Sequence, residues 1–256
     1  LQQLRTKLDK SEVYLARLEA YNKRVMIAEA ANCIHEALAV LGSDMPRNEE
    51  EATAALPKVI AEIDSLLQER SSEAIFNAPD IEDPEKVQIL RLLMNWVSMA
   101  YNVGPNMFAF TTLEPVRISL IHGNSPLSGL IYGAYGVFTA RMTGDFPRAY
   151  QFGELGLRMN ERAQVIELSG RAKQSVVGYV YHWIKPYSEC FSLMQEAYLE
   201  CLEAGDIDYA GYSAVHLLIL LYMKGTELQK MLVDVQTYGD FLVSTNNMGI
   251  VDIKRL

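Results

Sequence analysis

Apolar side chains recur every three or four residues along most of the chain, which is the spacing of one face of an α-helix. The apolar stretches end at turn signals around Gly104, Gly144, Lys185 and Gly225, which recur at a nearly constant interval. Helical patterns of about four turns lie on both sides of each turn signal. The β-branched residues form no alternating runs bounded by turns, so no strand is indicated. The pattern predicts an all-α protein built from helical hairpins, each closed by a tight turn.

Equivalent positions of successive hairpins carry similar side chains. Three columns, lying five, nine and twelve places after the turn signals, are small or apolar in three of four hairpins: Ala109, Ala149, Cys190 and Lys230; Leu113, Gly153, Met194 and Asp234; Val116, Gly156, Ala197 and Thr237. The last hairpin departs from the columns, which indicates a shifted phase after residue 225. A repeat of about 40 residues predicts a right-handed α-solenoid of antiparallel hairpins, in which stacking supplies the stability.

The predicted elements cover the chain as one helical-repeat domain, residues 1–256. Hairpins are expected near residues 1–42, 84–122, 126–162, 165–203 and 208–243, and a single amphipathic helix is expected near 48–71. We expect a loop between that helix and residue 85. The chain begins with a helical pattern and has no initiator methionine, so we expect it to be a piece of a longer polypeptide.

Small residues in the hairpin around Gly144 indicate close packing. Glycine inside a helix costs about 1 kcal/mol relative to alanine, so its presence suggests a gain in packing. The second helix has small residues on one face at Ala149, Gly153 and Gly156, and the first helix carries Gly133, Gly136 and Ala140. We predict that these faces let the two helices approach closely, with Gly153 in the contact.

Polar residues at the expected helix ends suit capping. Ser125, followed by Pro126, and Asp145 are expected N-caps, and either Asp206 or Asp208 should begin the helix that follows Gly205. The carboxylates of residues 49–51 and 80–83 are expected to be solvated and to complement the dipoles of their own helices.

The charge and composition of the chain argue against two kinds of partner, nucleic acids and membranes. The net charge of −9 would repel phosphate backbones, and the chain has no run of lysine or arginine, so a nucleic-acid partner is not expected. The longest apolar run, residues 212–223, is shorter than the ~20 residues of a membrane-spanning helix, so no membrane contact is expected. Three cysteines, Cys33, Cys190 and Cys201, form no CxxC motif and are expected to be buried, reduced thiols of a cytoplasmic protein.

Several segments carry a resemblance to known repeats. A helical hairpin with GDF at its turn (residues 144–146), Ala149 five places on and small residues at the next columns resembles the tetratricopeptide repeat, although the period here is longer than is usual for that repeat. The segments DKSEVYLARLEAYNKR, ALAVLGSDMP, IHGNSPLSGLIYGAYGVF, GDFPRAYQFGELGLRM and SLMQEAYLECLEAGDIDYAGYSA look like the helical-repeat region of large multidomain signalling kinases.

The resemblance implies a regulatory or sensing role. In that family a serine/threonine-kinase-like domain is followed by an ATPase of the STAND class, by these repeats, and then by a GAF domain and a histidine kinase. No catalytic residue is carried over, because the chain contains no GxxxxGK[ST], HRD, DFG or phosphoacceptor histidine motif. We therefore expect a chain that is not an enzyme and needs no cofactor.

Other candidate chemistry has simpler explanations. His35, His122, His182 and His216 lack the spacing that would place two imidazoles on one helical face, so no metal site is expected. The stretch HGNSPLSG could suggest a serine nucleophile, but capping by Ser125 explains it. The stretch GAYG at 133–136 lacks the strand context of a dinucleotide loop.

One column is a candidate binding surface. The first helices of stacked hairpins line the concave side of a solenoid, and three places before each turn signal lies a hydrogen-bond donor. With neighbours on the same face, the candidate residues are Asn95, Tyr101, Tyr135, Arg141, Tyr179, His182, His216 and Tyr222. These side chains could form a peptide or ligand groove, or they could be edges of the core with wet tips.

The sequence therefore favours a non-catalytic interaction and sensing module that regulates an adjacent STAND-type ATPase and kinase. Its expected partners are a protein or peptide, or neighbouring domains of the same polypeptide. Two alternatives remain open. A superhelix could enclose a small-molecule inducer, or exposed apolar ends could form a homodimer.

Overall fold

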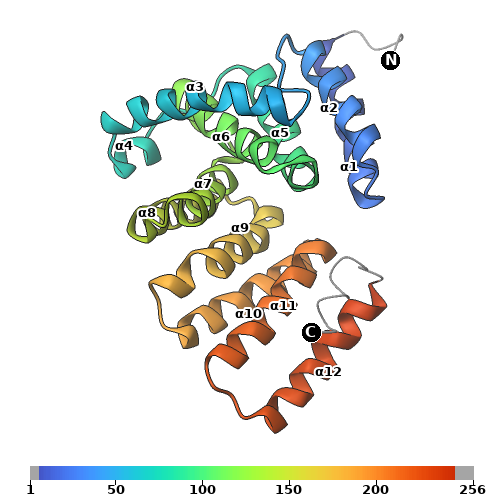
Figure 1. The fold of residues 1–256 in the computed structure, drawn as a ribbon, viewed down its shortest axis with the longest axis vertical. Coiled ribbons are helices and arrows are strands. Elements are labelled where there is room, and N and C mark those ends of the chain that lie inside the picture. Colours follow the sequence, from blue (N-terminus) through green and yellow to red (C-terminus); the bar gives the residue numbers. More distant parts are fainter. Residues whose placement is uncertain (1–5, 246–256) are drawn as a thin grey trace. The chain divides into compact units, whose positions relative to one another are not determined.

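The computed structural model describes residues 6–245, and this part of the chain is helical without strands, which confirms the all-α prediction (Figure 1). The helices are α1 (Lys7–Lys23), α2 (Ile27–Val40), α3 (Glu49–Gln68), α4 (Ser72–Phe76), α5 (Pro84–Val103), α6 (Pro105–His122), α7 (Ser128–Thr143), α8 (Phe146–Ala163), α9 (Ile166–Tyr179), the 3-10 helix η1 (Tyr181–Trp183), α10 (Tyr187–Glu203), α11 (Ile207–Met223) and α12 (Leu228–Ser244).

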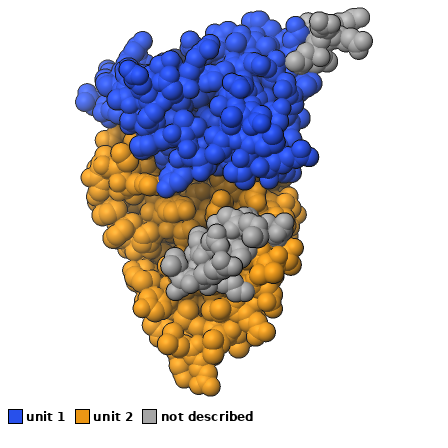
Figure 2. Space-filling model, turned by 45° about the vertical axis from the view of Figure 1, so that its right-hand side comes forward, with its two compact units in different colours: residues 1–131 blue, residues 132–256 orange. Residues whose placement is uncertain are grey.

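The chain divides into two compact units, residues 1–131 and 132–256 (Figure 2). The continuous solenoid, its handedness, its repeat period and the single domain stay predictions.

In the first unit, α5 packs against α1, α2 and α6, and α3 packs on α6. Its largest fully buried side chains include Leu18 of α1, Ile34 of α2, Trp96 of α5 and Met107 of α6. Polar contacts reinforce the same pairs of helices: the Asn22 amide donates to the backbone oxygen of Asn95 at 2.8 Å. One apolar core therefore joins helices from both ends of the unit.

The segment between α3 and α5, expected to be a loop, contains the five-residue helix α4 and is held by Asn124. The Asn124 side-chain amide donates to the backbone oxygens of Ile75 (2.9 Å) and Ala78 (3.2 Å). Its backbone N–H donates to Pro79 O at 2.8 Å, and its own backbone oxygen accepts from Ile81 N at 2.7 Å. A single asparagine thus supplies this segment with the hydrogen-bond partners that its backbone would have in a regular helix or strand.

The carboxylates at the start of α3 were expected to be solvated, and one of them is not. Glu51 accepts the N–H of Arg47 and so stays within its own helix end. Glu49, expected to be solvated, instead accepts the backbone N–H groups of Asn106 and Met107 at the start of α6. The prediction for Glu49 was wrong because its partner helix begins far along the sequence.

In the second unit, α9 contacts α8, α10 and α11, and α11 also contacts α10 and α12. The shared core includes Val176 and Val177 of α9, Met194 of α10 and Leu217 of α11. Two predicted caps are confirmed: Asp145 accepts the N–H of Arg148 at 3.0 Å, and Asp206 caps α11.

The predicted close approach of α7 and α8 at their small residues is confirmed. A Cβ at Gly136 would lie 2.7 Å from the backbone oxygen of Ala149, so α7 does lie directly against the backbone of α8 there. A Cβ at Gly153, however, would lie 2.8 Å from the Cγ1 of Val176, which belongs to α9. Gly153 therefore lies in the predicted α7–α8 contact, with its backbone nitrogen 3.0 Å from where a Cβ at Gly136 would stand, and it also accommodates a side chain of α9, which the prediction did not include.

Candidate interaction surface

The predicted concave residues are divided between the two units. Asn95 and Tyr101 belong to the first unit, and the other six belong to the second. The side-chain oxygen of Asn95 accepts the amide of Asn22 at 2.7 Å, so its polar tip bonds within the unit. Tyr101 is 55% exposed and its ring contacts Phe108 edge-on, with centroids 5.6 Å apart.

Three of the six residues in the second unit do not join a common cluster. Tyr135 is buried: its ring meets Phe152 edge-on at 4.6 Å, and its hydroxyl accepts from Arg148 at 3.1 Å. Arg141 and Tyr222 are exposed near the ends of α7 and α11. Tyr135 therefore offers little accessible surface to a partner, because its ring packs inside the α7–α8 hairpin.

Of the other three, Tyr179 of α9 and His216 of α11 come together, and His182 follows in η1. The Tyr179 and His216 rings meet edge to face, with centroids 5.0 Å apart and planes at 81°. The ring of His182 lies against that of Trp183, and a charge on His182 would lower the pKa of His216. We call Tyr179, His182, Trp183 and His216 the Tyr179–His216 surface.

Gly178 makes this arrangement possible. The imidazole of His216 lies so close to the α9 backbone that a Cβ at Gly178 would be 2.9 Å from both Cδ2 and Nε2. Any larger residue at this position would push the ring outwards. The pairing of Tyr179 with His216 thus depends on a missing side chain one residue away.

A hydrogen bond to the backbone fixes the orientation of His216. Its Nδ1 lies 2.9 Å from the backbone oxygen of Tyr212 and 3.3 Å from the side-chain nitrogen of Gln174, which is buried. A carbonyl oxygen can only accept, so we assign the proton to Nδ1, which donates to Tyr212, and the acceptor role to Nε2. The Gln174 nitrogen is then a neighbour of Nδ1 and not its hydrogen-bond partner.

Both imidazoles are held in the neutral form. Burial lowers the pKa of His216 below its usual value; the hydrogen bond to Tyr212 opposes this shift, and nearby His182 adds to it. Burial likewise lowers the pKa of His182, and the hydrogen bonds that its ring donates to the backbone of Val177 and Gly178 oppose this shift. The surface is therefore uncharged at pH 7 on these two rings.

Exposed aromatic area completes the surface. Tyr179 is 47% exposed and Trp183 is 57% exposed. Trp183 stacks on Phe146 with centroids 4.6 Å apart and lies 4.9 Å from His182. Aromatic side chains that are held in place and carry polar tips are enriched where proteins bind one another.

The prediction missed Trp183 and Gln174. Trp183 directly follows a predicted residue, and an exposed tryptophan next to a turn signal was a usable indication. Gln174 gave no such signal, because its role depends on a ring far along the sequence, that of His216.

The other chemical candidates are used structurally. The Ser125 hydroxyl accepts the N–H of Leu127 at 3.2 Å, although α7 begins only at Ser128. All three cysteines are buried, as predicted, and are free thiols. Residues 6–245 contain no group of three or more histidine, cysteine, aspartate or glutamate side chains arranged to hold a metal ion. None of the helices described is long and apolar enough to cross a membrane.

No protein-family model matches the chain. Among curated proteins the chain is similar to the hybrid signal transduction histidine kinase G of Dictyostelium discoideum, with 23% identity over 155 residues. The match covers 60% of this chain and 4% of the length of that relative. This distant similarity, together with the all-helical fold, hints at signalling.

Proposed function

We propose that this chain is a non-catalytic interaction and sensing module of a longer signalling polypeptide. The observation that carries the proposal is the Tyr179–His216 surface, where exposed rings are held by half-buried neighbours and burial lowers the pKa of both imidazoles. Such a surface can recognise a protein or peptide by apolar contact and a few hydrogen bonds. The similarity to a hybrid histidine kinase supports a place in signal transduction.

The proposed regulation is physical coupling to neighbouring domains. Within a polypeptide that carries a STAND-type ATPase and kinase domains, a partner bound to this module would favour the domain arrangement in which its surface is accessible. The module would contribute binding energy, and the other domains would contribute the chemistry.

An affinity-capture experiment tests the proposal. The tagged chain, residues 1–256, is compared with the double variant Tyr179→Ala, Trp183→Ala and with Leu199→Ala, a control at an exposed apolar residue of α10 (57% exposed). We expect defined partners to be retained by the wild type and the control and to fall about tenfold with the double variant, as expected when rigid aromatic anchors are removed. Equal capture by all three proteins, with helicity unchanged, would contradict the proposal.

A further inference from the structure

The imidazole of His216, on α11, lies directly against the backbone of α9. A Cβ at Gly178 would be 2.9 Å from its Nε2 and 3.2 Å from its Cε1, so the ring fills the place that a side chain would take on α9. Its other nitrogen, Nδ1, donates to the backbone oxygen of Tyr212 at 2.9 Å. The neutral ring therefore uses its proton within α11 and turns its unprotonated nitrogen towards α9.

A second proton on this ring would have no acceptor in this position. It would create an N–H group at Nε2, and within residues 6–245 that nitrogen has no hydrogen-bond partner. Next to it, Val177 and Gly178 already accept hydrogen bonds from the ring of His182. A charged donor that is partly shielded from water and lacks an acceptor is costly, so we expect a protonated His216 to move away from α9.

The groups on the α9 side of the ring do not offset that cost. From α9 the ring of Tyr179 meets it, and from η1 His182, a second imidazole, influences it. Neither group is negatively charged at neutral pH, and a proton on His182 would make His216 harder to charge. Burial therefore outweighs the hydrogen bond to Tyr212 and lowers the pKa of His216.

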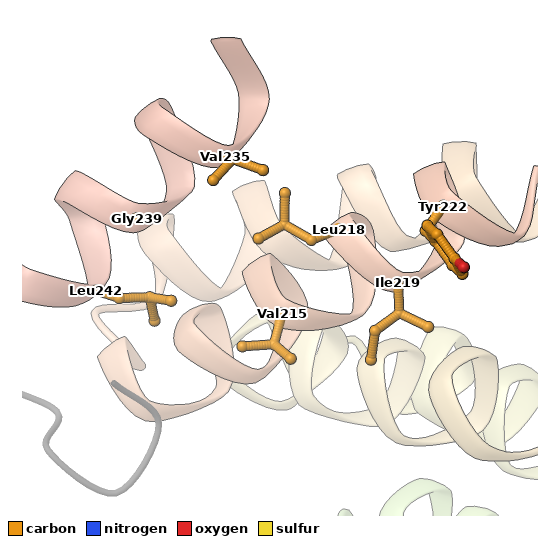
Figure 3. Close-up of a pocket in the computed structure, with 7 residues that line it drawn as sticks. All are labelled: Val215, Leu218, Ile219, Tyr222, Val235, Gly239 and Leu242. Atoms are coloured by element: carbon orange, nitrogen blue, oxygen red, sulfur yellow. The ribbon is translucent and has the colours of Figure 1, made fainter. Parts of the chain in front are cut away.

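The other helices packed on α11 do not supply a negative charge either. On α10, burial raises the pKa of the Cys201 thiol, which lies beside Ser213 of α11, to about 12, so that this thiol stays neutral. The carboxylate of Asp206, at the start of α11, is bound by Arg171. Helix α12 forms an apolar groove with α11, and three uncharged residues line the groove from α12 (Figure 3): Val235, Gly239 and Leu242. No carboxylate of the described chain is among the groups that influence His216.

Both exposed aromatic rings of the Tyr179–His216 surface lie against an imidazole. The rings of Tyr179 and His216 meet with centroids 5.0 Å apart, and Trp183 lies 4.9 Å from His182. Movement of His216 away from α9 would take from Tyr179 the ring that it meets on α11. The positions of the exposed rings therefore depend on the charge of the imidazoles next to them.

We propose that the Tyr179–His216 surface is a pH-sensitive switch, assembled while His216 is neutral and opened when this ring takes up a proton and leaves Gly178. Because charging His216 is unfavourable in the folded chain, the surface opens at a pH below the ordinary histidine value of about 6.5. The inference rests on the proposed function for its consequence, which is that a bound partner is released on acidification. The switch itself can be measured without a partner.

Nuclear magnetic resonance of the full chain, labelled with carbon-13 in its histidine and tyrosine rings, follows the switch from pH 7.5 to pH 5.0. The variants His216→Gln and Tyr179→Phe assign the signals, and circular dichroism monitors the helices over the same range. We expect His216 to titrate below pH 6.5 and the Tyr179 signals to shift with the same midpoint, while the helicity is unchanged. The Tyr179 signals should lose this transition in His216→Gln and keep it in His122→Gln, a control at an exposed histidine.

The variant Gly178→Ala provides a second test, because its methyl group would displace the His216 ring already at neutral pH. Its His216 should titrate closer to pH 6.5 than that of the wild type, and its Tyr179 signals should change little with pH. The wild-type titration decides the matter if this variant does not fold. Tyr179 signals that do not follow His216, a His216 midpoint at or above about 6.5, or a loss of helicity with the same midpoint would each overturn the switch.

Failure of the switch and failure of the proposed function give different results. If the titration is as expected but Tyr179→Ala, Trp183→Ala captures the same partners as the wild type, the proposed function is wrong. If that double variant loses its partners but the Tyr179 signals of the wild type do not follow His216, the surface binds partners and the switch is wrong.

Discussion

The carboxylate of Glu49, at the start of α3, accepts the backbone N–H of Asn106 in the first turn of α6 at 2.8 Å. Its second oxygen accepts the N–H of Met107 at 2.9 Å. Helix α6 has no side-chain cap of its own, since Gly104 stands at its N-cap position. A charge from one helix therefore caps another, where the dipole of α6 favours a negative group.

Replacing Glu49 with alanine should destabilise the first unit. Two N–H groups would lose a charged acceptor, so we expect the free energy of unfolding to fall by about 2 kcal/mol. Urea denaturation followed by circular dichroism measures the change. Glu50→Ala, at the exposed next residue, is the control and should stay within about 0.5 kcal/mol of the wild type. Equal effects of the two variants would show that Glu49 is not a cap.

Gly104 and Glu49 should be energetically coupled. A Cβ at Gly104 would lie 2.2 Å from Oε2 of Glu49, so Gly104→Ala forces the carboxylate away from α6. The added methyl group should cost much less once Glu49 is already alanine. A double-mutant cycle should therefore give a coupling free energy of about 1 kcal/mol or more, and strictly additive effects would argue against the contact.

Two glycines of the second unit should respond differently to alanine. Gly136→Ala places a methyl group against the backbone oxygen of Ala149, which cannot rotate away, and should cost about 1–3 kcal/mol. Gly153→Ala meets the Cγ1 of Val176, and the variant Val176→Ala removes that atom. In thermal unfolding, Val176→Ala should offset part of the Gly153→Ala effect and none of the Gly136→Ala effect. Rescue of Gly136→Ala would contradict the assigned contacts.

Local chemistry explains which features the sequence could reveal. The cap formed by Asp145 was predictable because its partner, Arg148, lies three places away and capping is a local preference. Helix type and approximate extent were likewise evident from apolar spacing. Glu49 and Asn124 were not recognised because their partners lie on other elements, at distances in the sequence that no local pattern marks.

The candidate surface was only partly predictable for a similar reason. Counting residues back from each turn signal found His182. Adding neighbours on the same predicted face found Tyr179 and His216, but also Tyr135, whose ring is buried against Phe152. Position along a helix indicates a face only approximately. Which rings meet depends on how closely the helices approach, and here that is set by Gly178.

Replacing Asp206 should destabilise the fold more than replacing an ordinary helix cap. One oxygen accepts the N–H of Tyr209 at the start of α11, and the other accepts two N–H groups of Arg171 at 2.9 and 2.7 Å. Asp206→Ala should therefore lower the free energy of unfolding by about 2–4 kcal/mol, because it removes a cap and leaves a partly buried guanidinium without this partner.

Asp145→Ala provides the comparison for Asp206, since Asp145 caps α8 through a single bond to the backbone of Arg148. It should cost about 1 kcal/mol. Denaturant titrations of both variants, at the same pH and salt concentration, measure the difference. Equal losses would mean that the ion pair with Arg171 contributes nothing beyond capping.

Acidification should destabilise the fold through His216. Burial lowers the pKa of His216 in the folded chain, while the unfolded chain keeps the ordinary value near 6.5. As the pH falls below about 6.5, the unfolded chain therefore binds protons first and the folded state loses stability. The groups around His216 are Tyr179, Gln174, His182 and the carbonyl of Tyr212, and none of them offers a negative charge at neutral pH.

The contribution of His216 is thus complete above a pH of about 6.5 and is lost on the acidic side. Thermal unfolding at pH 7.5, 6.5 and 5.5 should show a falling midpoint in the wild type and a shallower fall in His216→Gln. His122→Gln, at an exposed histidine, is the control for the loss of an imidazole as such. If His216→Gln shows the wild-type slope, the half-buried imidazole of His216 is not the group that links folding to pH.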